Sequence, residues 1–178
     1  DDFYLFIAQK YGRALKFIPD EYKTLDVCID AISNDPRAIK YVDEHRRTID
    51  MCKCAVYQDP ALYTYCQVDG VLSNITYEMV MFMVSQDPRY ISVIHNIETF
   101  MKFSGTMMIQ ALVVFAVSKD PDVIKLIDER FRYDNVCQIA VNHNGLLLEH
   151  VSKSKQTESI IFDALNDNPL ALKFIKGN

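Results

Sequence analysis

Asp-Pro dipeptides at a regular spacing constrain this chain more than any other feature of its sequence. Pro36 and Pro60 stand 24 residues apart in consecutive segments that share the pattern DE-x-x-(K/R)-T-(L/I)-D-x-C-x-x-A-(I/V)-x-x-D-P. A fixed period of this length is typical of repeat proteins. The same alignment gives one anchor residue per repeat, at spacings of 24, 24, 28, 33, 24 and 24: Gly12, Pro36, Pro60, Pro88, Pro121, Gly145 and Pro169.

The residues ahead of each anchor predict an amphipathic α-helix. Positions are numbered here from the anchor, so that position −5 lies five residues before it. Positions −8, −5 and −4 are apolar or small in all seven repeats, and this spacing marks one face of a helix. Position −5 is alanine in five repeats, which predicts a close approach of a second helix: Ala31, Ala55, Ala116, Ala140 and Ala164.

Capping residues predict where these helices begin and end. Threonine recurs at the expected N-cap, and Asp134 stands at about the same place in a further repeat: Thr24, Thr48, Thr76 and Thr157. A threonine hydroxyl accepts a hydrogen bond from a free N–H of the first helical turn. The residue before a proline leaves the α region, so the first helix of a repeat is expected to end near Asn34. The Asp or Asn before the anchor then caps a second helix of about six residues.

These signals together predict an all-α fold, a solenoid-like array of about seven short helix-turn-helix repeats. We expect one domain over residues 1–178, because one repeat alone cannot bury its apolar face and stacking supplies the core. The 67–94 and 95–127 repeats carry insertions. The approximate repeat boundaries are 1–19, 20–42, 43–66, 67–94, 95–127, 128–151 and 152–178.

Composition excludes several classes of function. The net charge is −5, with 19 basic and 24 acidic residues, which makes nucleic acid an unlikely partner because such binders neutralise phosphates with Lys and Arg. The apolar runs are too short for a membrane span. Three of the five cysteines recur at one repeat position, so we interpret the cysteines as buried thiols of a reducing intracellular compartment.

Signatures of chemistry are missing from the sequence. We find no phosphate-binding glycine loop, nucleophile elbow or metal-spaced cluster. The Asp residues before the anchors are explained as helix caps. We therefore expect no enzymatic activity, no catalytic residue, no metal, no cofactor and no small-molecule ligand.

Two groups of residues are candidates for binding a partner. Six of the seven methionines lie between Met79 and Met108, and methionine is favoured on adaptable binding surfaces. The insertion near them adds apolar residues for which the repeat has no standard pocket: Ile97, Phe100, Met101, Phe103, Met107 and Met108. These residues either form a contact patch or close an irregular part of the core.

A second, weaker candidate is a basic stripe: Arg13, Lys16, Arg37 and Lys40. Its lysines are equally explained by the negative C-terminal end of a helix.

Several segments resemble a known repeat. The stretches ALKFIPDEYKT (14–24) and AVNHNGLLLEHV (140–151), with the core C-x-x-A-(I/V)-x-(N/Q)-(D/N)-(P/G)-x-A-(I/L), resemble a domain-of-unknown-function repeat common in giant DNA viruses. The same repeats occur in some intracellular bacterial effectors and protists. The resemblance covers nearly the whole chain and implies a helical repeat fold. It implies no activity, and it makes a virion or the host cytoplasm the expected location if the chain is viral.

The functional expectation is a non-catalytic helical-repeat scaffold for protein–protein binding or assembly, with another protein or copies of itself as partner. Two alternatives stay open. One is a structural subunit of a virion or other large complex, and the other is a substrate-recognition module of an effector enzyme.

Overall fold

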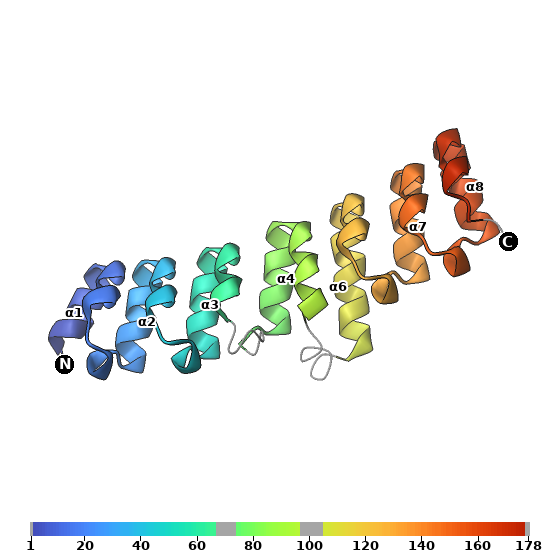
Figure 1. Ribbon diagram of the computed structural model, residues 1–178. Helices are drawn as coiled ribbons and strands as arrows, with labels where there is room; N and C mark the ends of the chain where they lie inside the picture. The colour runs from blue at the N-terminus through green and yellow to red at the C-terminus, as the bar shows by residue number, and fades with distance from the viewer. Residues whose placement is uncertain (1, 67–73, 97–104, 177–178) are drawn as a thin grey trace. The chain divides into compact units, whose positions relative to one another are not determined.

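A computed structural model describes residues 2–66, 74–96 and 105–176, and for residues 94–96 it describes the backbone alone. Within these ranges the chain is all-α, with no strand. Figure 1 shows the repeating pattern of one α-helix followed by a short returning helical segment. The α-helices are α1 (Asp2–Lys10), α2 (Leu25–Asn34), α3 (Ile49–Gln58), α4 (Tyr77–Gln86), α6 (Thr106–Lys119), α7 (Asp134–His143) and α8 (Glu158–Asp167).

The predicted second helix of each repeat is a 3-10 helix, not an α-helix. Its N-terminal residue is the anchor, and the segment is too short to gain much from α-helical hydrogen bonds. These segments are η1 (Gly12–Phe17), η3 (Pro36–Tyr41), η5 (Pro60–Cys66), η6 (Pro88–Asn96), η7 (Pro121–Leu126), η9 (Gly145–His150) and η11 (Pro169–Phe174). Single 3-10 turns also interrupt the polar linkers: η2 (Asp20–Tyr22), η4 (Glu44–Arg46), η8 (Glu129–Phe131) and η10 (Lys153–Lys155).

The predicted caps are confirmed, with one exception. The hydroxyls of Thr24, Thr48, Thr76 and Thr157 each accept from the backbone N–H three residues later, at 3.3 Å. The carboxylate or amide before the anchor caps the 3-10 helix that follows in every described repeat except the first, where Tyr11 makes no such bond. Asp35, for example, accepts from the backbone N–H of Arg37, two residues later, at 3.0 Å. The exception is Asp134, which is the first residue of α7 and not its cap. An acidic residue is stabilising in the first turn too, because it faces the positive end of the helix dipole.

The chain forms two compact units, Asp1–Gln86 and Asp87–Asn178. In the first unit, α1 to α4 pack against one another in chain order. In the second unit, α6, α7 and α8 do the same. The core of each unit is the set of repeated apolar positions, and the alanines at position −5 are completely buried.

Glycine anchors show how closely successive repeats approach. A methyl group added at Gly12 would lie 2.3 Å from the carbonyl oxygen of Ala31, and one at Gly145 would lie 2.2 Å from that of Ala164. Both alanines stand at position −5 of the following repeat. The backbone N–H of Gly12 donates to Asn34 Oδ1 at 2.8 Å, and that of Gly145 donates to Asp167 Oδ2 at 2.7 Å. A glycine anchor thus brings an N–H that the next repeat satisfies, whereas a proline anchor has none.

Candidate partner-binding site

Polar side chains at position −13 bind backbone carbonyl oxygens in four repeats, and in three of these repeats one of the bonds reaches the repeat before. Arg47 donates to the carbonyl oxygens of Val42 and Tyr65 at 3.0 and 2.9 Å. Arg132 donates to those of Ile127 and His150 at 2.8 and 2.7 Å. Gln156 and Lys23 stand at the same position, and they donate to the carbonyls of Phe174 and Tyr41 respectively. We call these residues the carbonyl latch: Lys23, Arg47, Arg132 and Gln156.

Side chains at position −14 add a further hydrogen bond between a repeat and the one before it. Arg46 Nη2 donates to the carbonyl oxygen of Lys23 at 2.6 Å, and Asn74 Nδ2 donates to that of Arg47 at 2.6 Å. Lys155 donates in the same way to the carbonyl of Arg132. Sequence reasoning missed these roles. The sequence feature that could have revealed them is the Lys or Arg that recurs directly before the capping threonine.

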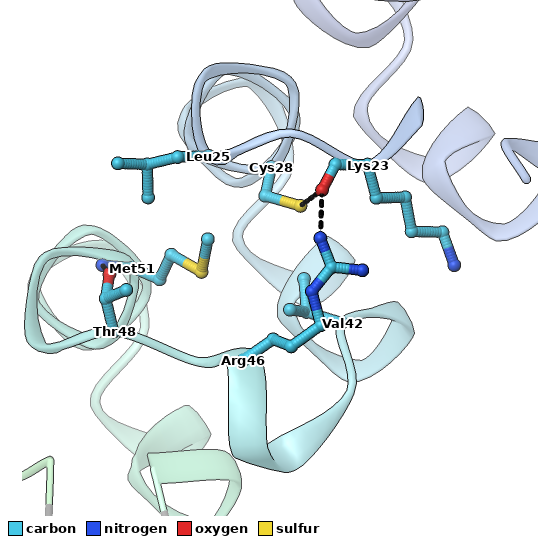
Figure 2. Close-up of a pocket in the computed structure, with 7 residues that line it drawn as sticks. All are labelled: Lys23, Leu25, Cys28, Val42, Arg46, Thr48 and Met51. Carbon is cyan, nitrogen blue, oxygen red and sulfur yellow. Dashed lines mark hydrogen bonds between the residues drawn. The ribbon is translucent and has the colours of Figure 1, made fainter. Parts of the chain in front are cut away.

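A cavity of about 320 Å³ opens between the second and third repeats. Figure 2 shows its walls, with Leu25 and Met51 on two neighbouring helices and the Arg46 side chain reaching up to the carbonyl oxygen of Lys23. The carbonyl oxygen of Lys23 accepts from both Arg46 Nη2 at 2.6 Å and Cys28 Sγ at 3.7 Å. The remaining lining residues are Val42 and Thr48. Most of the wall is therefore apolar.

The polar groups of this cavity are already engaged. Burial raises the pKa of the Cys28 thiol, which keeps it protonated and a poor nucleophile. Lys23 Nζ bonds Asp20 Oδ1 at 2.7 Å and the carbonyl oxygen of Tyr41 at 3.1 Å. The cavity suits an apolar side chain better than a reacting substrate.

Exposed apolar residues stand at position −11, the first residue of the helices that flank this cavity. Leu25 lines the cavity with 52% of its surface exposed, and Ile49 is 43% exposed. The same position in the second compact unit carries Asp134 and Glu158. We call Leu25 and Ile49 the apolar mouth. This position is therefore apolar at the start of α2 and α3 in the first compact unit, and acidic at the start of α7 and α8.

The residues predicted at the insertion are only partly described. Ile97, Phe100, Met101 and Phe103 lie outside the described residues. Met107 and Met108 stand in the first turn of α6, where they are 79% and 41% exposed.

The four residues of the predicted basic stripe are all exposed on η1 and η3. Arg13 Nε bonds Asp35 Oδ2 at 2.5 Å. Burial alone would raise the pKa of Asp35, but the bonds from Arg13 and Arg37 hold it below its ordinary value. Lys16 and Lys40 each lie over the ring of the following residue, Phe17 at 5.6 Å and Tyr41 at 4.9 Å. An ionised carboxylate therefore stands among the cations of this stripe.

The described ranges offer neither a metal site nor a membrane-spanning helix. No group of three or more His, Cys, Asp or Glu side chains there could hold a metal ion. None of the helices in those same ranges combines the length and the apolar character that crossing a membrane requires.

A family model described as a domain of unknown function (DUF4116) matches residues 1–47. The matched segment contains the first two anchors, Gly12 and Pro36, and ends at the latch residue Arg47. No curated protein and no solved structure matches the chain.

Proposed function

We propose that this chain is a non-catalytic helical-repeat scaffold that binds another protein, and that the apolar mouth is a contact surface. The observation that carries the proposal is the exposure of Leu25, which lines an apolar cavity, and of Ile49, which holds the equivalent position one repeat later. Single exposed apolar residues are common on proteins, whereas grouped ones mark contact sites.

The size of the cavity favours a protein partner. At about 320 Å³ it lies at the lower end of the range for small-molecule pockets. Binding energy at protein interfaces concentrates in a few anchor side chains that fill well-packed pockets. An aliphatic or aromatic side chain of the partner would be enclosed by Leu25, Val42 and Met51, and its backbone would cross the N-terminal ends of α2 and α3.

The structure accounts for the conspicuous polar side chains of the repeats without chemistry. The Asp and Asn residues before the anchors cap 3-10 helices, and the cations before the capping threonines Thr24 and Thr48 bind carbonyl oxygens. These uses support a binding role over an enzymatic one.

The test is affinity capture by the intact chain from cells of its source, with bound proteins identified by mass spectrometry. The double variant Leu25→Asp and Ile49→Asp should lose specific partners while keeping its helical circular dichroism, because both side chains are exposed. The matched control is Asp134→Ala with Glu158→Ala, at position −11 of the second compact unit, and it should retain them. Equal capture by both variants would refute the apolar mouth as the site.

The start of α6 is a second candidate surface for the same function. Its support is the 79% exposure of Met107, together with the apolar residues that precede it in sequence. Replacing Phe100, Met101 and Phe103 together by Ser should abolish partner capture and leave the thermal unfolding midpoint unchanged. A variant that unfolds, or that still captures the partner, argues against this surface.

A structural subunit of a virion or other large complex is a second candidate function. The resemblance to repeats of giant DNA viruses supports it. The five cysteines are all free thiols, which supports a reducing intracellular location, such as host cytoplasm or a virion. Recovery of the chain from purified particles would favour the structural role, and recovery with a soluble enzyme would favour a recognition module.

A further inference from the structure

Acidic residues stand beside the apolar mouth, at position −10. Asp26 and Asp50 directly follow its two residues, Glu78 holds the same position in α4, and all three are exposed. Among the described residues no cation forms an ion pair with Asp26 or Asp50, and Glu78 lies 3.8 Å from Lys53 Nζ. The first compact unit thus carries exposed carboxylates in a row alongside the mouth.

The helix dipole alone does not explain where these carboxylates stand. An acidic residue in the first turn stabilises a helix, and α7 and α8 each have one, Asp134 and Glu158. In those helices the acid occupies position −11, and position −10 is Asn135 or Ser159. Either position satisfies the dipole. In α2 and α3 the acid takes position −10 and leaves position −11 to an apolar side chain, so a charged row lies beside an apolar one.

The two cations that line the cavity are bound by the chain itself. Arg46 donates to the carbonyl oxygens of Asp20 and Lys23 at 3.2 and 2.6 Å. Lys23 Nζ bonds Asp20 Oδ1 and the carbonyl oxygen of Tyr41, and in Figure 2 it points away from Leu25. A charged group arriving at the mouth therefore meets cations that already have acceptors and carboxylates that have no cation.

The spacing of the two mouth residues indicates which segment would fit them. Leu25 and Ile49 begin α2 and α3, which pack against each other, and packed helices lie about 8–10 Å apart. In a polyproline II segment, with three residues per turn, residues i and i+3 lie on one face about 9 Å apart. Two apolar residues at this separation would contact both mouth residues, and neighbouring side chains would lie near position −10.

We propose that the apolar mouth binds a basic segment of a partner protein, in which two apolar residues three positions apart are flanked by Lys or Arg. One apolar side chain enters the cavity beside Leu25, the other packs on Ile49, and the cations lie near Asp26 and Asp50. Charge complementarity favours this occupant over an acidic or an uncharged segment. The inference rests on the proposed function, because it names the partner chemistry of the same surface.

Fluorescence anisotropy with three labelled peptides tests this proposal on the full chain. The basic peptide is Lys-Leu-Lys-Lys-Leu-Lys, and the acidic and neutral peptides carry Glu or Ser in place of every Lys. The wild type should bind the basic peptide more tightly than the neutral one and the acidic peptide least. Added salt should reduce this preference, because it screens exposed charges.

The double variant Asp26→Asn and Asp50→Asn should bind the basic peptide about threefold to tenfold more weakly, the expected effect of losing two exposed ion pairs. Its affinity for the neutral peptide should not change. The matched control is Asp134→Asn with Glu158→Gln, which should bind like the wild type. Both double variants have the same net charge and lose one first-turn acid from each of two helices, so unspecific attraction and changes in helix stability are equal.

Leu25→Ser separates this proposal from the proposed function. It should weaken the binding of all three peptides, because the apolar contact is lost whatever the charge of the peptide. If it does so while the wild type binds the three peptides equally, the mouth is a contact surface without charge preference, and the basic partner is ruled out while the proposed function stands. If Leu25→Ser binds every peptide as the wild type does, both proposals fail.

Three further results would overturn the basic partner. The first is a preference for the acidic peptide, which would mean that Arg46 and Lys23 determine the charge of the occupant. The second is equal binding of the basic peptide to the two double variants, and the third is no binding of any peptide. Self-association of the peptide-free wild type that Leu25→Ser abolishes would assign the mouth to a second copy of the chain and would also contradict the proposal.

Discussion

The alanine at position −5 shows how little room separates two repeats. Ala31, Ala55, Ala140 and Ala164 are 0% exposed. For two of them the anchor of the preceding repeat comes so close that only glycine fits there. At those two anchors the backbone of the alanine occupies the space that a side chain would need, so successive repeats are in direct backbone contact.

Ala140→Leu should therefore lower the free energy of unfolding by about 1–3 kcal/mol, the usual cost of overpacking a closely packed core. Urea denaturation followed by circular dichroism measures the change. Ser159→Leu introduces the same side chain at an exposed helical position and should leave the midpoint nearly unchanged. Full stability of Ala140→Leu would contradict the alignment of the repeats.

The cysteines should behave as five separate thiols. Burial raises the pKa of Cys28 and of Cys137, and a hydrogen bond with Cys52 together with burial raises that of Cys66. Intact-mass analysis without reductant should show no disulfide. A thiol reagent at neutral pH should label Cys54 first, because it alone is partly exposed, and label the others only after unfolding. A Cys52–Cys66 bridge in the isolated protein would contradict this prediction.

At the scale of the elements, sequence periodicity was sufficient to predict the α-helices but not the contacts between successive repeats. Capping threonines and the Asp-Pro pairs locate the helix ends, because both act within three residues of their own position. The 3-10 geometry of η3 and its equivalents was not predicted, since apolar spacing over six residues fits either helix type. The carbonyl latch was missed because its acceptors, such as Ile127 and His150, are backbone atoms and leave no mark on the sequence.

The latch can be tested at Arg132. Arg132→Met keeps the length of the side chain but leaves the carbonyls of Ile127 and His150 without their donor. We expect a loss of about 2–4 kcal/mol in unfolding free energy, because both bonds come from a charged donor and are partly buried. Arg132→Gln should retain most of the stability, since Gln156 makes the equivalent pair of bonds. Equal losses of unfolding free energy in the two variants would show that the charge of Arg132, not its hydrogen bonds, stabilises this contact.

For the molecule as a whole, stability should follow the number of neighbours that a repeat has. In a repeat array, free energy is the sum of terms within repeats and terms between neighbours. The helix α7 packs between α6 and α8, whereas α8 has one α-helical neighbour among the described residues.

The candidate contact surfaces were harder to predict from sequence than this core. Leu25 and Ile49 look like ordinary core residues of a helical pattern until their exposure is known.

Amide hydrogen exchange should show this gradient directly. Backbone amides in the middle of α7 should exchange more slowly than those of α8, because opening α8 breaks one joint and opening α7 breaks two. Equal protection of the two helices would indicate that the second compact unit opens as one cooperative body.

The side-chain bonds that cross between repeats each connect a repeat to the one directly before it, which has a mechanical consequence. A force applied to the two ends of the chain acts on every contact between successive repeats in turn. Each regular repeat of 24 residues that detaches would lengthen the chain by about 80 Å when fully extended. Under tension the protein should therefore behave as an extensible tether that lengthens in discrete steps and recoils as repeats stack again on the remaining template.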